Sequence, residues 1–324
     1  MRTGRLLTTV VIQVSLLLFC GCQGAHYRNV ISAVPRDTAE ALYVTEHAGL
    51  AEAAGRNHIS IYWNGPRGGD DTQQQIVLAK RAVDEGDMGL VLSPNTPFAL
   101  NTVIQRALAH GVPVVVLGSA ISLPPSANLS LVINDEQQSG RLAAERIQAL
   151  LHGEGEIAMA GVDPMSPGTT DRANAFERWI SQIAPHVHIV SKLVGTFTFG
   201  QAEMAVEEVI EAHPHLAAVY ALNVPATRGA VAALRTSRRE ASIRIIGSDQ
   251  TLDLLFLLRE GAIDSLVIQD MRGMGAQAVE NIVAAREHRK VAAVTRYEPV
   301  LLRRANIDSE PIQQMLKMDW RPRE

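Results

Sequence analysis

The polar residues of this chain that could do chemistry stand at the ends of short apolar runs, one after another along the sequence. They include carboxylates, amides and a guanidinium group, which hydrogen-bond polar partners, and two rings that could cover apolar faces of a ligand. The candidates are Asp37, Tyr43, Arg172, Phe199, Asn223, Asp249 and Gln269. Such a set predicts the binding of a small polar ligand.

Catalytic chemistry has little support in the sequence. The chain contains no HExxH, GxSxG, Walker or GxGxxG motif, so no metalloprotease, hydrolase elbow or nucleotide loop is predicted. The ten histidines are scattered, and the pair His213 and His215 has no third ligand nearby. We therefore expect no enzyme activity, no cofactor and no metal site.

The first 22 residues have a composition of their own. Arg2 and Arg5 precede a mostly apolar run from Leu6 to Phe19, which is typical of an export signal and short for a membrane span. Both cysteines of the chain, Cys20 and Cys22, follow it, so a disulfide framework is not expected. The segment resembles a bacterial lipoprotein cleavage site, which implies a lipid on Cys22 and attachment to a membrane. A plain secretory signal with incidental cysteines is the alternative. Either reading places the protein in the periplasm or cell envelope.

The length and composition of the chain limit the fold and the kinds of function that remain. A chain of 324 residues with 47% hydrophobic residues is long enough for two lobes. The net charge of −4 and the aromatic content of 4% argue against a nucleic-acid surface, which needs a basic excess or stacking rings.

Apolar runs alternate with amphipathic stretches along the chain, a pattern that predicts βα units on parallel sheets. Strands are expected at 29–34, 59–63, 88–92, 112–117, 129–133, 156–160, 189–194, 218–222, 243–246, 266–269 and 296–302. Helices are expected at 39–54, 72–85, 97–110, 136–151, 171–183, 201–213, 226–236, 252–260 and 275–287, with a polar surface tail from 308. Two doubly wound α/β lobes follow, and ligands bind beyond the carboxyl ends of such strands.

The order of several segments resembles the type I periplasmic binding proteins of the ribose-binding group. The segments are VPRDTAEALYVTEHAG, WNGP with a following D and Q, VLSPN with VPVVVL, VINDEQQSG, TTDRANAF, YALN and IIGSDQ with LREGAIDSLVIQDMRGMG. The resemblance implies two lobes joined by a multi-strand hinge. It implies a first lobe of residues 28–131 and 270–298, a second of 132–269 and 299–310, and a tail of 311–324.

The resemblance also assigns roles to individual residues. Tyr43 matches a ring against the sugar face, and Arg172 matches an arginine that donates to hydroxyls. Asn223 matches a ligand-binding amide, Asp249 an accepting carboxylate, and Gln269 a glutamine beside the hinge. Phe199 is a candidate for a second ring.

One position departs from the family. After VVVL the family commonly has an aspartate that accepts from two sugar hydroxyls, and this chain has Gly118 followed by Ser119. Asp37 or Asp71 could substitute for it. The ligand is therefore expected to be sugar-like without being a standard pentose.

The resemblance further implies a monomer that closes on its ligand and is recognised by an ABC importer permease. A chemoreceptor or sensor kinase could read the closed form instead. The effector domain of a transcriptional regulator shares the fold, but the export signal occupies the place of its DNA-binding segment. A hydrolase is the weakest alternative, because no nucleophile arrangement is present.

Overall fold

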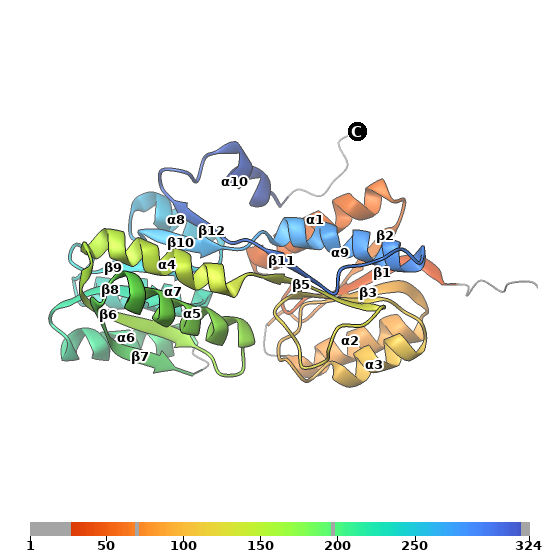
Figure 1. Ribbon diagram of the computed structural model, residues 1–324, viewed down its shortest axis with the longest axis horizontal. Helices are drawn as coiled ribbons and strands as arrows, with labels where there is room; N and C mark the ends of the chain where they lie inside the picture. Colours follow the sequence, from red (N-terminus) through yellow and green to blue (C-terminus); the bar gives the residue numbers. More distant parts are fainter. Residues whose placement is uncertain (1–26, 69–70, 196–197, 319–324) are drawn as a thin grey trace, which may run out of the picture.

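The computed structural model describes residues 27–68, 71–195 and 198–318. Over these ranges the chain forms two lobes side by side, each built on a six-stranded sheet with helices on both faces (Figure 1). The predicted fold class, two doubly wound α/β lobes, is confirmed. The predicted signal segment 1–22, including Cys22, lies outside the described residues.

The first lobe contains a fully parallel sheet in the order β11-β5-β4-β3-β1-β2. Its strands are β1 (Arg28–Val34), β2 (Ser60–Trp63), β3 (Asp87–Leu92), β4 (Val114–Gly118), β5 (Leu129–Asn134) and β11 (Val294–Tyr297). Helices α1 (Ala41–Arg56) and α9 (Met271–Arg286) cover one face, and α2 (Thr72–Asp84) and α3 (Asn101–Ala109) cover the other.

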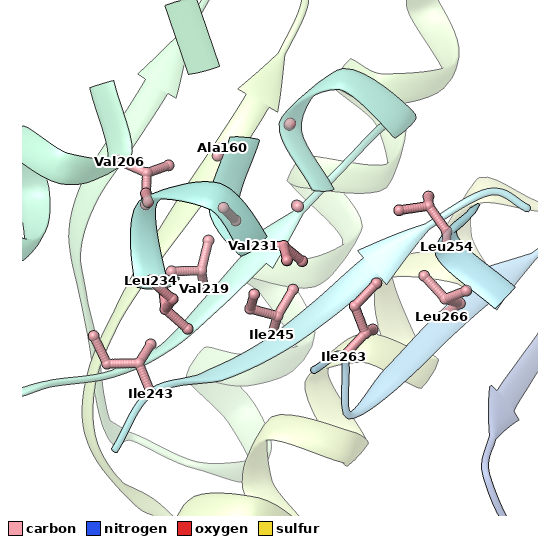
Figure 2. Close-up of a cluster of buried hydrophobic side chains, with 14 of the residues drawn as sticks. Ala160, Val206, Val219, Val231, Leu234, Ile243, Ile245, Leu254, Ile263 and Leu266 are labelled. Atoms are coloured by element: carbon pink, nitrogen blue, oxygen red, sulfur yellow. The ribbon is translucent and has the colours of Figure 1, made fainter. Parts of the chain in front are cut away.

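The second lobe repeats this arrangement with the order β12-β10-β9-β8-β6-β7, in which only β12 runs antiparallel. Its strands are β6 (Glu154–Val162), β7 (His186–Val194), β8 (Leu216–Ala221), β9 (Arg244–Ser248), β10 (Ser265–Ile268) and β12 (Val300–Arg303). Helices α4 (Glu136–Leu151) and α5 (Pro167–Ile183) cover one face, and α6 (Phe199–Ala212), α7 (Val224–Thr236) and α8 (Leu252–Glu260) cover the other. Figure 2 shows the second of these layers, where Val206 and Leu234 lie over Val219 of the sheet.

Burial on both faces explains the continuous apolar strands. Val114 and Val116 of β4 belong to the core beneath α2 and α3, whereas Val115 and Leu117 belong to the core beneath α1 and α9. Successive side chains of a strand point to opposite faces, so a strand covered on both sides must be apolar at every position. This is why VPVVVL is the clearest strand signal in the chain.

Small residues allow α1 and α9 to approach closely. A Cβ atom on Gly49 would lie 1.9 Å from the Arg272 carbonyl oxygen, and one on Gly275 would lie 2.4 Å from the Glu46 carbonyl oxygen. Both distances are shorter than any normal contact, so a larger residue at either position would push the helices apart. The close packing fixes α1, which carries two side chains of the site described below.

The chain passes between the lobes three times. It leaves the first lobe after β5 at Asn134, returns after β10 at Gln269, and leaves again between β11 and β12 at residues 298–299. These crossings join the lobes and form the region about which they could rotate. β5 runs to Asn134 in the first sheet, and α4 of the second lobe begins at Glu136.

Several sequence predictions need correction. Helices α5 and α9 begin at Pro167 and Met271, each four residues earlier than expected. The single strand expected at 296–302 is two strands in different sheets, because Pro299 lacks the N–H that a continuous ladder needs. The third helix begins at Asn101, four residues later than expected. The predicted tail contains α10 (Glu310–Met315), whose Ile312 is buried in the core of the second lobe, so residues 310–315 are not a surface extension.

Candidate functional site

A cavity of about 290 Å³ lies between the lobes at the carboxyl ends of both sheets. The first lobe contributes the loops after β1, β3 and β4 together with the start of α1, and the second lobe contributes the N-terminal ends of α4, α5, α7 and α8. The volume is near the lower end of the range for ligand sites, which spans roughly 300–1,000 Å³. The cavity is therefore of a size suited to one small molecule. Six of the seven predicted ligand-binding residues line it: Asp37, Tyr43, Arg172, Asn223, Asp249 and Gln269.

Arg172 lies on α5 and is only 2% exposed. Its Nε donates to Glu136 Oε2 at 2.7 Å and its Nη2 donates to Glu136 Oε1 at 3.0 Å, so the two side chains form a forked pair. Nη1 donates to the Leu222 carbonyl oxygen at 2.9 Å, and Asp249 Oδ1 lies 3.8 Å from Nη2. Burial alone would lower the pKa of Arg172, but Glu136 and Asp249 outweigh burial and raise that pKa above its usual value. The guanidinium is thus held in one orientation at the cavity wall.

Asp249 lies in the loop that follows β9. Its φ of +67° is in the left-handed region, which an aspartate adopts more readily than most residues. Its Oδ1 accepts a hydrogen bond from Gln269 Nε2 at 2.5 Å. Burial raises the pKa of Asp249, and Arg172 works against that rise. Gln269 is itself held by Gln250, whose Nε2 donates to the Gln269 carbonyl oxygen at 2.9 Å, so Asp249 is coupled to the second crossing.

Asn223 has a structural role that uses only part of its hydrogen-bonding capacity. Its Oδ1 accepts from Ala226 N at 2.9 Å and caps α7, while its Nδ2 donates to the Gly161 carbonyl oxygen at 3.0 Å. An amide has two donor hydrogens and two acceptor lone pairs, so one of each remains for a ligand.

The first lobe contributes Tyr43 and Asp37. Burial raises the pKa of the Tyr43 hydroxyl, and Glu46, Asp249 and Asp37 raise it further against the opposing effect of Arg36. Charged groups of both lobes therefore act on the phenol. Asp37 shapes the loop before α1, since its Oδ1 accepts from Ala39 N at 2.5 Å and Glu40 N at 3.1 Å.

A buried glutamine supports the first-lobe loops from beneath. Gln75 on α2 is fully buried and its Nε2 donates to the carbonyl oxygens of Pro35 at 3.0 Å and Ser93 at 2.9 Å. Its Oε1 accepts from Asn95 N at 3.1 Å. Gln75 thereby joins the loops after β1 and β3, and it holds the cavity lining in place without reaching the cavity.

Two positions weighed from sequence lie elsewhere. Phe199 starts α6, is 47% exposed and does not line the cavity, so the structure does not bring it to the other candidates. Asp71 caps α2 through Gln74 N at 2.9 Å and is also absent from the lining. Of the two substitutes considered from sequence for the aspartate missing at Gly118, Asp37 lines the cavity and Asp71 does not. A Cβ atom on Gly118 would have no neighbour within 4 Å, so the cavity is open at that point.

Three further acidic residues line the cavity that sequence reasoning did not single out: Glu40, Glu136 and Asp163. Glu136 is the first residue of α4, where an acidic side chain is ordinarily explained by the helix dipole. Asp163 follows β6 in a segment expected to be a plain loop, and its Oδ1 accepts from Met165 N at 2.9 Å. Asp163 could have been found, because it stands directly after a strand. Glu136 could not, because its partner Arg172 is 36 residues away in the sequence.

One ion pair connects the lobes at the rim of the cavity. Arg228 on α7 donates to both oxygens of Asp253, at 2.7 Å and 2.9 Å, and its Nη1 lies 3.4 Å from Oε1 of Glu40 in the first lobe. The three side chains are between 31% and 48% exposed, so solvent weakens their attraction. This contact can form only when the lobes are close together.

The site has the chemistry of binding. Its polar groups are fixed acceptors and donors supplied by both lobes, suited to a ligand with several hydroxyl groups. Among the residues that the structure describes, no three His, Cys, Asp or Glu side chains gather in a way that could hold a metal ion. No helix within the described ranges is long and apolar enough to cross a bilayer.

Comparison with known proteins agrees with this geometry. The family profile described as periplasmic binding protein domain matches residues 31–290. The ribose import binding protein of Bacillus subtilis (strain 168) is 26% identical over 211 residues, which cover 65% of this chain and 67% of that protein. The D-ribose/D-allose-binding protein of Pseudomonas aeruginosa is 23% identical over 240 residues, which cover 72% of this chain and 74% of that protein.

Solved structures share the fold. A carbohydrate transporter solute binding protein from Agrobacterium radiobacter, in complex with D-arabinose, superimposes with a TM-score of 0.80 at 23% identity, covering 89% of this chain and 98% of that one. An arabinose binding protein from Geobacillus stearothermophilus gives a TM-score of 0.80 at 22% identity, covering 86% and 98%.

Proposed function

Because this chain belongs to the periplasmic binding protein domain family, we propose that it captures a sugar or sugar derivative outside the cytoplasm and delivers it to an ABC importer. The observation that carries this proposal is the cavity lined by both lobes. Tyr43 and Asp37 lie on one side, and Arg172, Asn223 and Asp249 lie on the other. The relatives named above are a ribose import binding protein and a D-ribose/D-allose-binding protein, which supports the same ligand class.

Capture follows from the division of the site between two bodies. In an open arrangement the ligand would contact only one set of polar groups, and in a closed arrangement it contacts both. A ligand shifts an equilibrium only by its differential affinity for the two states, so a ligand held from both sides favours closure. We propose that the lobes rotate as units about the three crossings, and that the importer permease recognises the closed form of a monomer.

We also propose that Cys22 becomes the lipid-bearing N-terminus of the mature protein. The proposal rests on the sequence around Cys22, which resembles a lipoprotein cleavage site. A single lipid chain gives only marginal, reversible membrane attachment, so processing with more than one chain is expected. Mass spectrometry of protein purified from membranes tests it: a lipid mass on the peptide that begins at Cys22 is expected, and recovery of Cys22→Ala in the same membrane fraction would refute it.

Calorimetry and small-angle scattering together test the main proposal. A panel of pentoses, hexoses and polyols is titrated into mature protein, and any ligand that binds is then examined for a decrease in the radius of gyration. Arg172→Met and Asp249→Asn should each reduce affinity by at least about tenfold, because each removes a charged hydrogen-bonding group from the cavity. Phe199→Ala is the matched control, since that ring lies outside the cavity, and it should bind normally. Unchanged dimensions, or full affinity in both cavity variants, would refute capture at this site.

A further inference from the structure

The side chains that line the cavity carry more negative than positive charge. Five carboxyl groups line it, and they belong to Asp37, Glu40, Glu136, Asp163 and Asp249. The described lining contains two guanidinium groups, Arg36 and Arg172. An excess of this kind in a small cavity between two lobes is costly unless something in the cavity offsets it.

Part of the negative charge already has a partner. Glu136 is neutralised by the forked pair with Arg172 at 2.7 Å and 3.0 Å. Glu40 lies 3.4 Å from Arg228 at the rim. Asp37, Asp163 and Asp249 remain. Arg172 lies 3.8 Å from Asp249, and the charge of Arg36 also acts to lower the pKa of that carboxyl.

These three aspartates each use one oxygen for the protein and leave the other for the cavity. Oδ1 of Asp37 accepts from the backbone of its own loop, Oδ1 of Asp163 accepts from Met165 N, and Oδ1 of Asp249 accepts from Gln269. Within the described part of the chain, the Oδ2 atoms of all three make no hydrogen bond or ion pair. Asp37 is only 7% exposed, Asp163 only 8%, and the Asp249 side chain 14%, so these carboxylates have little access to water apart from the cavity that they line.

We propose that the ligand of this cavity is a monosaccharide or small polyol that carries a protonated amine; the sugar part of this inference rests on the function proposed above. An ammonium group has three donor hydrogens and one positive charge. It can therefore satisfy carboxylate oxygens that approach from different directions and reduce the charge excess at the same time. Asp37 belongs to the first lobe and the other two aspartates to the second, so the amine would be held from both sides on closure.

A neutral sugar meets only half of this requirement. A hydroxyl group can donate to a free carboxylate oxygen, but it brings no charge into the closed cavity. An ammonium group makes the same kind of hydrogen bond to the carboxylate and, in addition, supplies the opposite charge. The same excess of carboxylates disfavours a phosphorylated or acidic sugar.

Matched ligands separate the two cases. D-Glucose, D-glucosamine and N-acetyl-D-glucosamine share one ring and differ at one substituent, and the galacto and manno series provide the same comparison for other ring stereochemistry. Affinities are measured by calorimetry at a pH below the pKa of the amine and again above it. Tris(hydroxymethyl)aminomethane and pentaerythritol form a matched pair of an amine and a neutral polyol without a sugar ring.

Asp163→Asn is the informative variant, because it removes one charge while its Oδ1 can still accept from Met165 N. Asp37→Asn is a second variant, because it also removes one charge while its Oδ1 can still accept from Ala39 N. Glu211→Gln on the exposed face of α6 is the control, since it removes one charge far from the cavity.

We expect an amino sugar to bind at least about tenfold more tightly than its hydroxyl and N-acetyl counterparts. That preference should decrease several-fold in Asp163→Asn or Asp37→Asn, persist in Glu211→Gln, and decrease when the amine loses its proton. Equal or tighter binding of the neutral sugar, or an unchanged preference in both aspartate variants, would overturn the inference and leave the sugar-binding function intact. Binding of the amine polyol with no binding of any sugar would instead refute the sugar class and support the recognition of an amine. Binding of nothing in the panel, with no closure, would overturn both.

Discussion

Glu46 is a carboxyl group that the first lobe holds in an unusual environment. It lies on α1 and is only 1% exposed, and its two oxygens accept hydrogen bonds from Ser93 Oγ at 3.0 Å and 2.8 Å. Burial raises the pKa of Glu46 from 4.5 to about 8, and the hydrogen bond from Ser93 offsets only part of that effect. Replacement of Glu46 by Gln keeps the shape and the polar contact with Ser93 but removes the titration.

The pKa of Glu46 is higher in the folded protein than in the unfolded chain. Between about 4.5 and about 8, the native state therefore retains a proton that the unfolded state has released. The free energy of unfolding decreases as pH rises through that window, by about 1.4 kcal/mol per pH unit, and the decrease ends above the folded pKa. Over about two pH units inside the window, wild type should lose roughly 2–3 kcal/mol relative to Glu46→Gln.

Urea denaturation at a series of pH values measures this difference. Trp63 lies in the first lobe, so a background that retains only this tryptophan reports the lobe that contains Glu46. His47 stacks on Trp63 at 4.6 Å between ring centroids, and its own titration affects wild type and variant alike, so it cancels in the difference. The exposed Glu211→Gln serves as the control and should follow wild type at every pH. A difference in stability between wild type and Glu46→Gln that stays constant with pH would refute the burial argument.

Three further predictions follow from contacts in the second lobe and at the rim. Glu136→Leu should destabilise the second lobe by about 3 kcal/mol, because it leaves the Arg172 guanidinium buried without its main partner. Urea denaturation followed through Trp fluorescence measures this loss. The double variant with Arg172→Met should be less destabilised than the sum of the two single variants, and simple additivity would contradict a coupled pair. Glu40→Gln removes the partly exposed contact with Arg228 between the lobes, so it should weaken ligand binding by about twofold to fivefold, mainly through faster dissociation. The difference from wild type should be smaller at high salt, and an unchanged dissociation rate in stopped-flow measurements would count against the prediction. Gly161→Ala places a side chain at φ +83° and 2.7 Å from the cap of α7, so it should lower the free energy of unfolding by about 1–3 kcal/mol and also reduce affinity; wild-type affinity in calorimetry would show that the cap does not support the site.

Local pattern was enough to predict the sheets but not every element within them. The strand β4 was evident because two covered faces require an apolar residue at each position. The last predicted strand was wrong because only Glu298 and Pro299 separate β11 from β12. The sheet pairing shows that the two strands belong to different lobes. The start of α10 was missed because a short helix with one buried residue, Ile312, gives almost no periodic signal.

The site shows the same division between local and distant information. Asn223 and Asp249 could be proposed from sequence because residues just after parallel strands meet at one edge of a sheet. Phe199 was proposed as a second ring, but it begins α6, is 47% exposed and is absent from the cavity lining. Glu136 could not be found, because its importance comes from a pair with Arg172 that forms only when α4 and α5 pack together.

The residues that line the cavity and those that join the lobes are partly the same, and this links binding to movement. Glu136 begins α4 directly after the first crossing, and Gln269 stands at the second crossing while it donates to Asp249. Asp135 N donates to the Tyr297 carbonyl oxygen at 2.8 Å, which connects the first crossing to the third. A ligand that contacts Arg172 and Asp249 therefore acts on side chains whose other partners belong to the crossings. Rotation of the lobes must change the geometry of these hydrogen bonds, so the free energy of binding and the free energy of closure are coupled through a small number of shared contacts.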